Sequence, residues 1–87
     1  MNNFGGALDY YIKALGINES LNDRVEMAKD YWGIGQALKK LNKRKKAAES
    51  VQSGLNILLE LEKETGYRHP LVETLKQIKE SLDDKGA

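Results

Sequence analysis

Residues that could carry out acid–base or metal chemistry are few in this chain. It holds one histidine, His69, and no cysteine, so no second soft ligand or nucleophile exists to complete a site. His69 precedes Pro70, which indicates a role at the start of a helix. Glu60, Glu62 and Glu64 alternate, and because this spacing prevents them from sharing one helix face, we expect them to be solvated. The sequence therefore predicts no catalysis, no cofactor and no metal.

Two closely spaced glycines, Gly33 and Gly35, lie inside a helical pattern and do not follow a strand, so they do not form a phosphate-binding loop. Each costs a helix about 1 kcal/mol relative to Ala. We expect Gly35 to lie where two helices cross at close range, opposite Ala47 and Val51, so that packing offsets the lost propensity. Gly33 has no such expected contact: it either leaves room beside Trp32 or weakens the helix.

A run of cations occupies residues 39–46, KKLNKRKK. Six of its eight residues are basic: Lys39, Lys40, Lys43, Arg44, Lys45 and Lys46. The formal net charge of only +1 disfavours a nucleic-acid partner, and no interleaved aromatic residues offer a stacking platform for bases. A solvated turn is the favoured interpretation. Binding of RNA, DNA or an anionic surface, and contact with an acidic protein, are the alternatives.

The composition indicates a single small all-α domain. The chain has 87 residues, many helix formers and one proline. No apolar run approaches the roughly 18 residues of a membrane span, and the amino terminus lacks the pattern of a signal peptide. We therefore expect no membrane partner. Because the chain has no cysteine, we expect a reducing, cytoplasmic setting.

Apolar periodicity predicts four amphipathic helices, over about residues 4–21, 24–41, 44–65 and 70–84. Asn22 or Asp23 suits the N-cap of the second helix. Asn42 suits the left-handed position after that helix, and Gly66 the end of the third. Pro70 fits the first turn of the fourth helix.

The four helices form an internal repeat. The first lies over the third at an offset of 40 residues, with Ala14 on Gly54. The second lies over the fourth at an offset of 44 residues, with Tyr31 on Leu75. A repeated helix pair of this length indicates a short solenoid of stacked antiparallel helices.

One part of this repeat, residues 28–59, resembles the tetratricopeptide (TPR) family. Its pattern is Tyr31-x-x-Ile34-Gly35-x-x-Leu38, then Ala47-x-x-x-Val51 and small Gly54. It departs from the family at Val51, where an aromatic residue is usual, and at Leu59, where proline is usual. The period of about 40 residues is similar to that of the longer TPR variants.

The resemblance implies a non-catalytic scaffold that binds a protein or peptide partner. In TPR proteins the first helix of each pair lines a concave groove, and the corresponding residues here are Lys29, Trp32, Gln36, Lys39, Lys76 and Glu80. Trp32 would be the anchor of such a site; the alternative is that it packs against a neighbouring helix. The family's carboxylate clamp is not implied, because Trp32 and Gln36 occupy two of its positions.

The same alignment starts the chain inside the turn between two helices of a repeat. One whole repeat then lies between two halves, whereas three repeats are usually needed for a stable stack. We expect either a fragment of a longer array or a short chain that forms homo-oligomers, with the exposed face of the first helix seeking a partner. A self-associating four-helix bundle, with helices about 20° from antiparallel around a closed core, is the other interpretation.

Overall fold

The computed structural model describes residues 3–83, which form an all-α structure of four helices without strands. The helices are α1 (Phe4–Ser20), α2 (Arg24–Lys40), α3 (Arg44–Thr65) and α4 (Leu71–Asp83). Their described ends lie within one residue of the predicted ends. Residue 84, the predicted end of the fourth helix, lies outside the described residues. Pro70 immediately precedes α4 and is not part of its first turn, which corrects the prediction by one residue.

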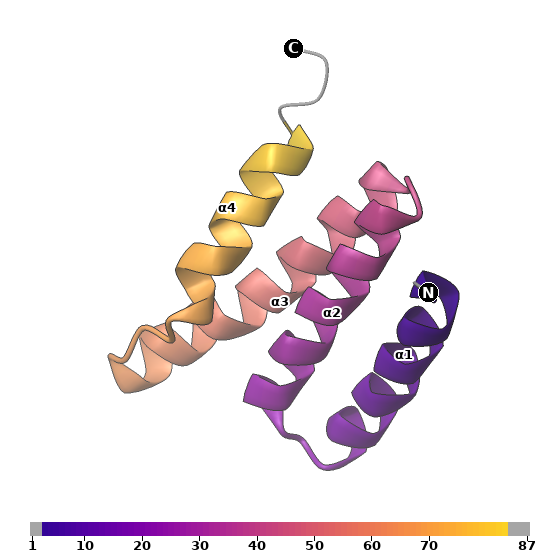
Figure 1. The fold of residues 1–87 in the computed structure, drawn as a ribbon. Helices are drawn as coiled ribbons and strands as arrows, with labels where there is room; N and C mark the ends of the chain where they lie inside the picture. Colours follow the sequence, from indigo (N-terminus) through magenta and orange to yellow (C-terminus); the bar gives the residue numbers. More distant parts are fainter. Residues whose placement is uncertain (1–2, 84–87) are drawn as a thin grey trace.

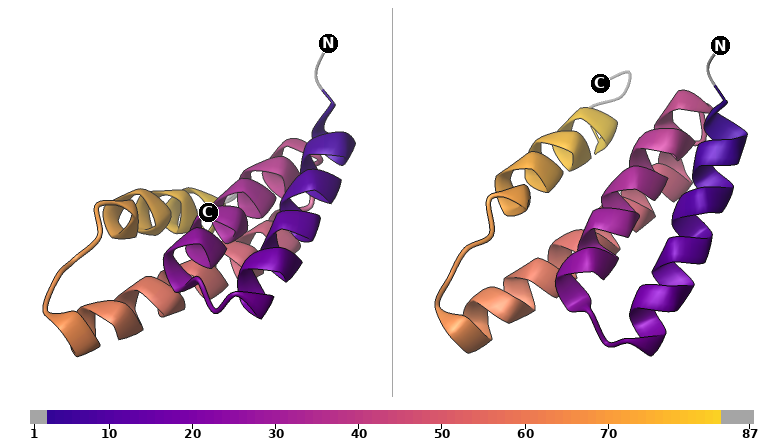
Figure 2. Two further views of the ribbon diagram at one scale, coloured as in Figure 1. Left: turned by 90° about the horizontal axis from the view of Figure 1, so that it is seen from below. Right: turned by 60° about the horizontal axis from the view of Figure 1, so that its bottom comes forward.

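The helices pack in chain order, α2 on α1, α3 on α2 and α4 on α3 (Figure 1). The molecule measures 37 × 32 × 19 Å, and its smallest dimension matches about two helix diameters. Figure 2 shows α1 and α4 at opposite ends of the stack. Every extensive helix–helix contact within residues 3–83 joins consecutive helices. This order favours an open stack over a closed four-helix bundle.

The turns after α1 and α2 share one sequence pattern and one backbone geometry. Both read Leu-Asn-x-Arg, and both asparagines have positive φ, 56° at Asn22 and 65° at Asn42. The prediction for Asn42 is thereby confirmed. In each turn the amide after the asparagine donates to the carbonyl five residues earlier, over 2.9 Å. The repeat thus has a finer unit, one helix and one turn in 20 residues, within the predicted offset of 40.

The ends of the helices depend on local side chains. Asp23 caps α2, as predicted, by accepting a hydrogen bond from the Glu26 amide at 3.3 Å. Lys43 holds the same position before α3 and makes no side-chain cap. Gly66 ends α3 in the predicted left-handed conformation, with φ of 79°.

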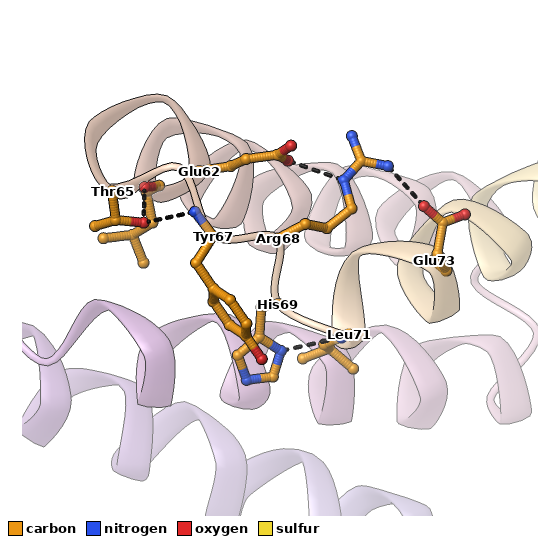
Figure 3. Close-up of polar contacts among 8 residues, drawn as sticks. Glu62, Thr65, Tyr67, Arg68, His69, Leu71 and Glu73 are labelled. Atoms are coloured by element: carbon orange, nitrogen blue, oxygen red, sulfur yellow. Dashed lines mark hydrogen bonds and ion pairs between the residues drawn. The ribbon is translucent and has the colours of Figure 1, made fainter.

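The connection from α3 to α4 is held by one arginine and one histidine (Figure 3). Arg68 donates to Glu62 at 2.9 Å and to Glu73 at 2.7 Å, which ties the end of α3 to the start of α4. Glu62 keeps 30% of its side-chain surface exposed, and its pairing with Arg68 was not predicted from the sequence. The His69 Nδ1 atom accepts a hydrogen bond from the Leu71 amide at 3.0 Å. His69 therefore begins a helix, as its place before proline predicted.

The core is formed by α2, α3 and α4, and its largest fully buried side chains are Val51, Leu58, Val72 and Leu75. Gly35 lies where α2 crosses α3: a Cβ atom there would be 2.6 Å from Val51 Cγ2 and 3.4 Å from the Ala47 carbonyl oxygen. This confirms the predicted close approach. By contrast, α1 has no fully buried residue and contributes only half-buried side chains to the core.

Gly33 has a packing role that the sequence did not indicate. A Cβ atom at this position would lie 2.6 Å from the ring of Tyr11 on α1. Real Cβ atoms do not approach an aromatic ring so closely, so Gly33 makes room for Tyr11. The contact with Tyr11 contradicts the explanation that Gly33 merely weakens the helix, whereas space beside Trp32 stays a prediction.

Candidate functional site

A groove of about 410 Å³ lies over α2 and is also lined by residues of α1 and α4. Its floor is apolar and comes from three helices: Phe4, Ala7, Tyr11, Gly33, Ala37 and Ile78. Its rim is polar or cationic and comes from α2 alone: Gln36, Lys39 and Lys40. Within residues 3–83, no acidic side chain lines the groove.

The spacing on α2 explains why one helix supplies both floor and rim. Gln36 and Ala37 lie three and four residues after Gly33, and Lys40 lies four and three residues after them, so all of them share one helix face. Across from them, the Tyr11 ring lies against Gly33 and in edge contact with the ring of Tyr10, with centroids 5.5 Å apart and planes at 74°. The aromatic part of the floor is therefore held in place from two sides.

Of the six partner-binding residues predicted from the sequence, Gln36 and Lys39 line this groove. Both are exposed, and Lys39 Nζ lies 3.4 Å from Ser81 Oγ on α4. The other four do not line it. Lys29 pairs with Glu26 on its own helix at 3.0 Å.

Two of the remaining three predicted residues, Lys76 and Glu80, lie on α4. Glu80 lines a separate polar depression with Gln77, Ser81 and Asp83, and Lys76 is half-buried. The structure therefore does not bring Lys76 and Glu80 together with Gln36 and Lys39 in one groove.

Trp32 is half-buried and packs against the hydrophobic core. Its indole Nε1 is buried and meets no acceptor within the described part of the chain. A buried donor without a partner is costly. This placement matches the alternative in which Trp32 packs against a neighbouring helix.

The basic run contains two kinds of side chain. Its five lysines, Lys39, Lys40, Lys43, Lys45 and Lys46, are exposed, and none forms an ion pair with another residue in the range 3–83. Arg44 is half-buried, and its Nη2 atom donates to the carbonyls of Ser81 at 2.8 Å and Leu82 at 3.2 Å. These carbonyls end α4, where cations are favourable. Arg44, predicted as a possible anion ligand, thus joins α3 to α4.

A second arginine, Arg24, makes the equivalent link one helix earlier. It starts α2 as Arg44 starts α3, and it forms a two-pronged ion pair with Glu64 at the end of α3, over 3.0 and 2.7 Å. Glu64 is exposed, as predicted, and the ion pair with Arg24 is a contact that the sequence analysis did not predict. The hydrogen bond with Glu64 raises the pKa of Arg24, and the same bond lowers the pKa of Glu64. The recurrence of Leu-Asn-x-Arg was the signal for these links.

One acidic side chain, Asp30 of α2, is buried. It accepts a hydrogen bond of 2.6 Å from the Asn18 side-chain amide of α1. Asp30 was not a candidate residue in the sequence, because a single acid inside a helix carries no signal of its surroundings. The pair is a polar contact between α1 and α2 next to a largely apolar interface.

Residues 3–83 contain no group of three or more histidine, aspartate or glutamate side chains placed to hold a metal ion. In the same range, no helix has the length and apolar character needed to cross a membrane. Comparisons with protein-family models, with curated proteins and with solved structures gave no significant match. The class that the fold defines is an all-α stack of four antiparallel helices.

Proposed function

We propose that this protein is a non-catalytic protein-interaction module of TPR-like type that binds a peptide segment in the groove lined by α1, α2 and α4. The observation that supports this most is the make-up of the groove, an apolar floor drawn from three helices beside a cationic rim. Concave sites that bind ligands combine apolar walls with a few convergent polar groups. The absence of cysteine supports a cytoplasmic setting for this module.

The chemistry of the groove suggests the chemistry of its peptide. Apolar side chains would cover the floor around Tyr11 and Ile78, while an acidic group would lie at Lys39 and Lys40. Since no acid lines the groove among the described residues, nothing in it repels such a group. Exposed ion pairs contribute little by themselves, so the lysines would set orientation and selectivity, and the apolar floor would supply most of the affinity.

The alternative is binding of nucleic acid or an anionic surface through residues 39–46. It is supported by the five exposed lysines without ion pairs in the described range. It is weakened by Arg44, whose guanidinium already donates hydrogen bonds to carbonyls at the end of α4. Such binding would weaken steeply with salt, with a slope of about 0.9 per neutralised duplex phosphate.

Two pairs of charge reversals separate these functions. Lys39→Glu with Lys40→Glu changes the groove rim, whereas Lys45→Glu with Lys46→Glu makes the same change in charge outside the groove. The probes are a labelled peptide with two leucines followed by three glutamates, its lysine counterpart, and a labelled DNA duplex. Fluorescence anisotropy measures binding, and circular dichroism verifies that each variant is folded.

We expect the acidic peptide to bind to the unmodified protein. Lys39→Glu with Lys40→Glu should weaken its affinity at least about tenfold, whereas Lys45→Glu with Lys46→Glu should leave its affinity unchanged. Equal effects of the two variants on the peptide, or preference for its lysine counterpart, would refute the groove proposal. If the module binds the duplex with a strong salt dependence and both variants weaken it alike, the function is nucleic-acid binding instead.

A further inference from the structure

The outer side of α1 carries an apolar stripe that α2 does not cover. We call Tyr10, Ala14, Ile17 and Leu21 the outer stripe, because intervals of four, three and four residues align them on one face. Tyr10 is 68% exposed, Ile17 62% and Leu21 68%. Large apolar side chains gathered on one exposed face mark an interaction surface.

The internal repeat shows what kind of element such a stripe packs against. At the offset of 40 residues, the outer stripe lies over Ser50, Gly54, Ile57 and Leu61 of α3. There, a Cβ on Gly54 would approach Tyr31 Cβ at 3.1 Å and the Ala28 carbonyl oxygen at 3.2 Å, and both belong to α2. Ile57 and Leu61 are half-buried against the core. The outer stripe is thus the equivalent of the α3 face that another helix covers.

The α4 helix of a second copy of the chain is not suited to cover the outer stripe. α4 is the repeat equivalent of α2, and it lies at the opposite end of the stack from α1 (Figure 2). However, its leucines and valine are buried, and its exposed side chains are polar: Glu73, Gln77, Glu80, Ser81 and Asp83. Its remaining apolar residue, Ile78, lines the groove. A head-to-tail array would therefore place a polar face on an apolar one, which disfavours it.

The outer stripe itself is the apolar helix face that a second copy can offer. It contains no charged residue, so it neither repels an identical stripe nor selects a charged partner. Ala14 lies between Tyr10 and Ile17, where a small side chain permits close approach of two helices. We propose that two copies pair through their outer stripes, antiparallel about a two-fold axis near Ala14, with Tyr10 of one copy against Ile17 of the other.

This arrangement closes after two copies, because the same surface serves both sides of an isologous interface. A single pair of helices covers less than the roughly 800 Å² per partner of a standard interface. We therefore expect a dissociation constant on the order of 10–100 µM. No residue of the outer stripe lines the groove, so pairing and peptide binding can be tested separately.

Sedimentation equilibrium of the 87-residue chain between about 10 µM and 1 mM, a range set around that expected affinity, tests the pairing. We expect a monomer–dimer equilibrium. Ile17→Glu should raise its dissociation constant at least about 100-fold, because the two-fold axis introduces the charge twice. Tyr67→Glu is the matched control, since Tyr67 is 63% exposed in the connection between α3 and α4, and it should leave the equilibrium unchanged. A monomer throughout, an open-ended series of oligomers, or equal effects of the two variants would overturn the proposal.

A second measurement does not depend on the folding of Ile17→Glu. The chain has no cysteine, so Ala14→Cys and Tyr67→Cys each carry a single thiol. Under mild oxidation we expect Ala14→Cys to form a disulfide-linked dimer quickly, because the axis brings the two thiols together, while Tyr67→Cys reacts only by random collision. Equal rates in the two variants would refute pairing through α1 and would leave the groove proposal untouched.

Discussion

From the close crossing of α2 and α3 at Gly35, we predict that Gly35→Ala lowers the stability of the fold. Alanine favours a helix by about 1 kcal/mol over glycine. Against this, the new Cβ would lie 2.6 Å from Val51 Cγ2 and 3.4 Å from a backbone oxygen. Val51 is fully buried and β-branched, so it cannot move aside easily. Overpacking of this kind costs about 1–3 kcal/mol, and we expect Gly35→Ala to lie in the upper half of this range. Subtracting the gain of about 1 kcal/mol in helix propensity leaves a net destabilisation of about 1–2 kcal/mol.

Gly16→Ala is the matched control, because Gly16 is also inside a helix but a Cβ there would meet no atom within 4 Å. This variant should be stabilised by about 0.5–1 kcal/mol from helix propensity alone. Thermal and urea unfolding followed by circular dichroism measure both variants. For a domain of this size, 1 kcal/mol shifts Tm by about 4–8 °C. If Gly35→Ala raised Tm as much as Gly16→Ala, the helices would not cross closely at Gly35.

A double-mutant cycle assigns the effect to one contact. Val51→Ala removes the Cγ2 atom that a Cβ at position 35 would meet, and by itself it should destabilise the protein through the cavity that it leaves. In the Val51→Ala background, Gly35→Ala should cost little or become stabilising. We expect a coupling free energy of about 1–3 kcal/mol. Additive effects of the two substitutions would refute this explanation.

Three further substitutions test other contacts. Trp32→Phe should preserve or raise the free energy of unfolding because it removes a buried N–H without an acceptor, whereas Trp32→Ala should lower it by about 2–3 kcal/mol; urea unfolding compares them. Arg44→Met should speed amide exchange in the last turn of α4, since it removes both hydrogen bonds to the carbonyls there. The Arg24 bond holds the pKa of Glu64 below its ordinary 4.5, so this pair stabilises the fold above that pH, and the contribution is lost as pH falls through the lowered pKa. Tm measured against pH should therefore fall less in acid for Glu64→Gln than for the unmodified chain.

The positions of the helices were largely readable in the sequence because the signals for them are local. Apolar periodicity and a few end residues determine where a helix starts and stops. Asp23, Asn42, Gly66 and His69 act within three or four residues of their own positions. The close approach at Gly35 was also predictable, since a glycine in the middle of a helix requires a packing reason.

The candidate site was only partly predictable. Gln36 and Lys39 were found, but Phe4, Tyr11 and Ile78 were not, because they reach the groove only after α1 and α4 have docked on their neighbours. A pattern on one helix specifies a face, but it does not say which other helix faces it or at what angle.

The sequence by itself determined four helices, their ends and the repeat that relates them, since these depend on residues a few positions apart. Tertiary structure alone decided that Gly33 makes room for Tyr11, that Trp32 packs against the hydrophobic core and that Arg44 donates hydrogen bonds to the end of α4. Each of these contacts joins residues more than 20 positions apart or depends on which side of a helix its neighbour occupies. Packing between whole helices, not local propensity, sets such contacts, and it also left the outer stripe of α1 exposed.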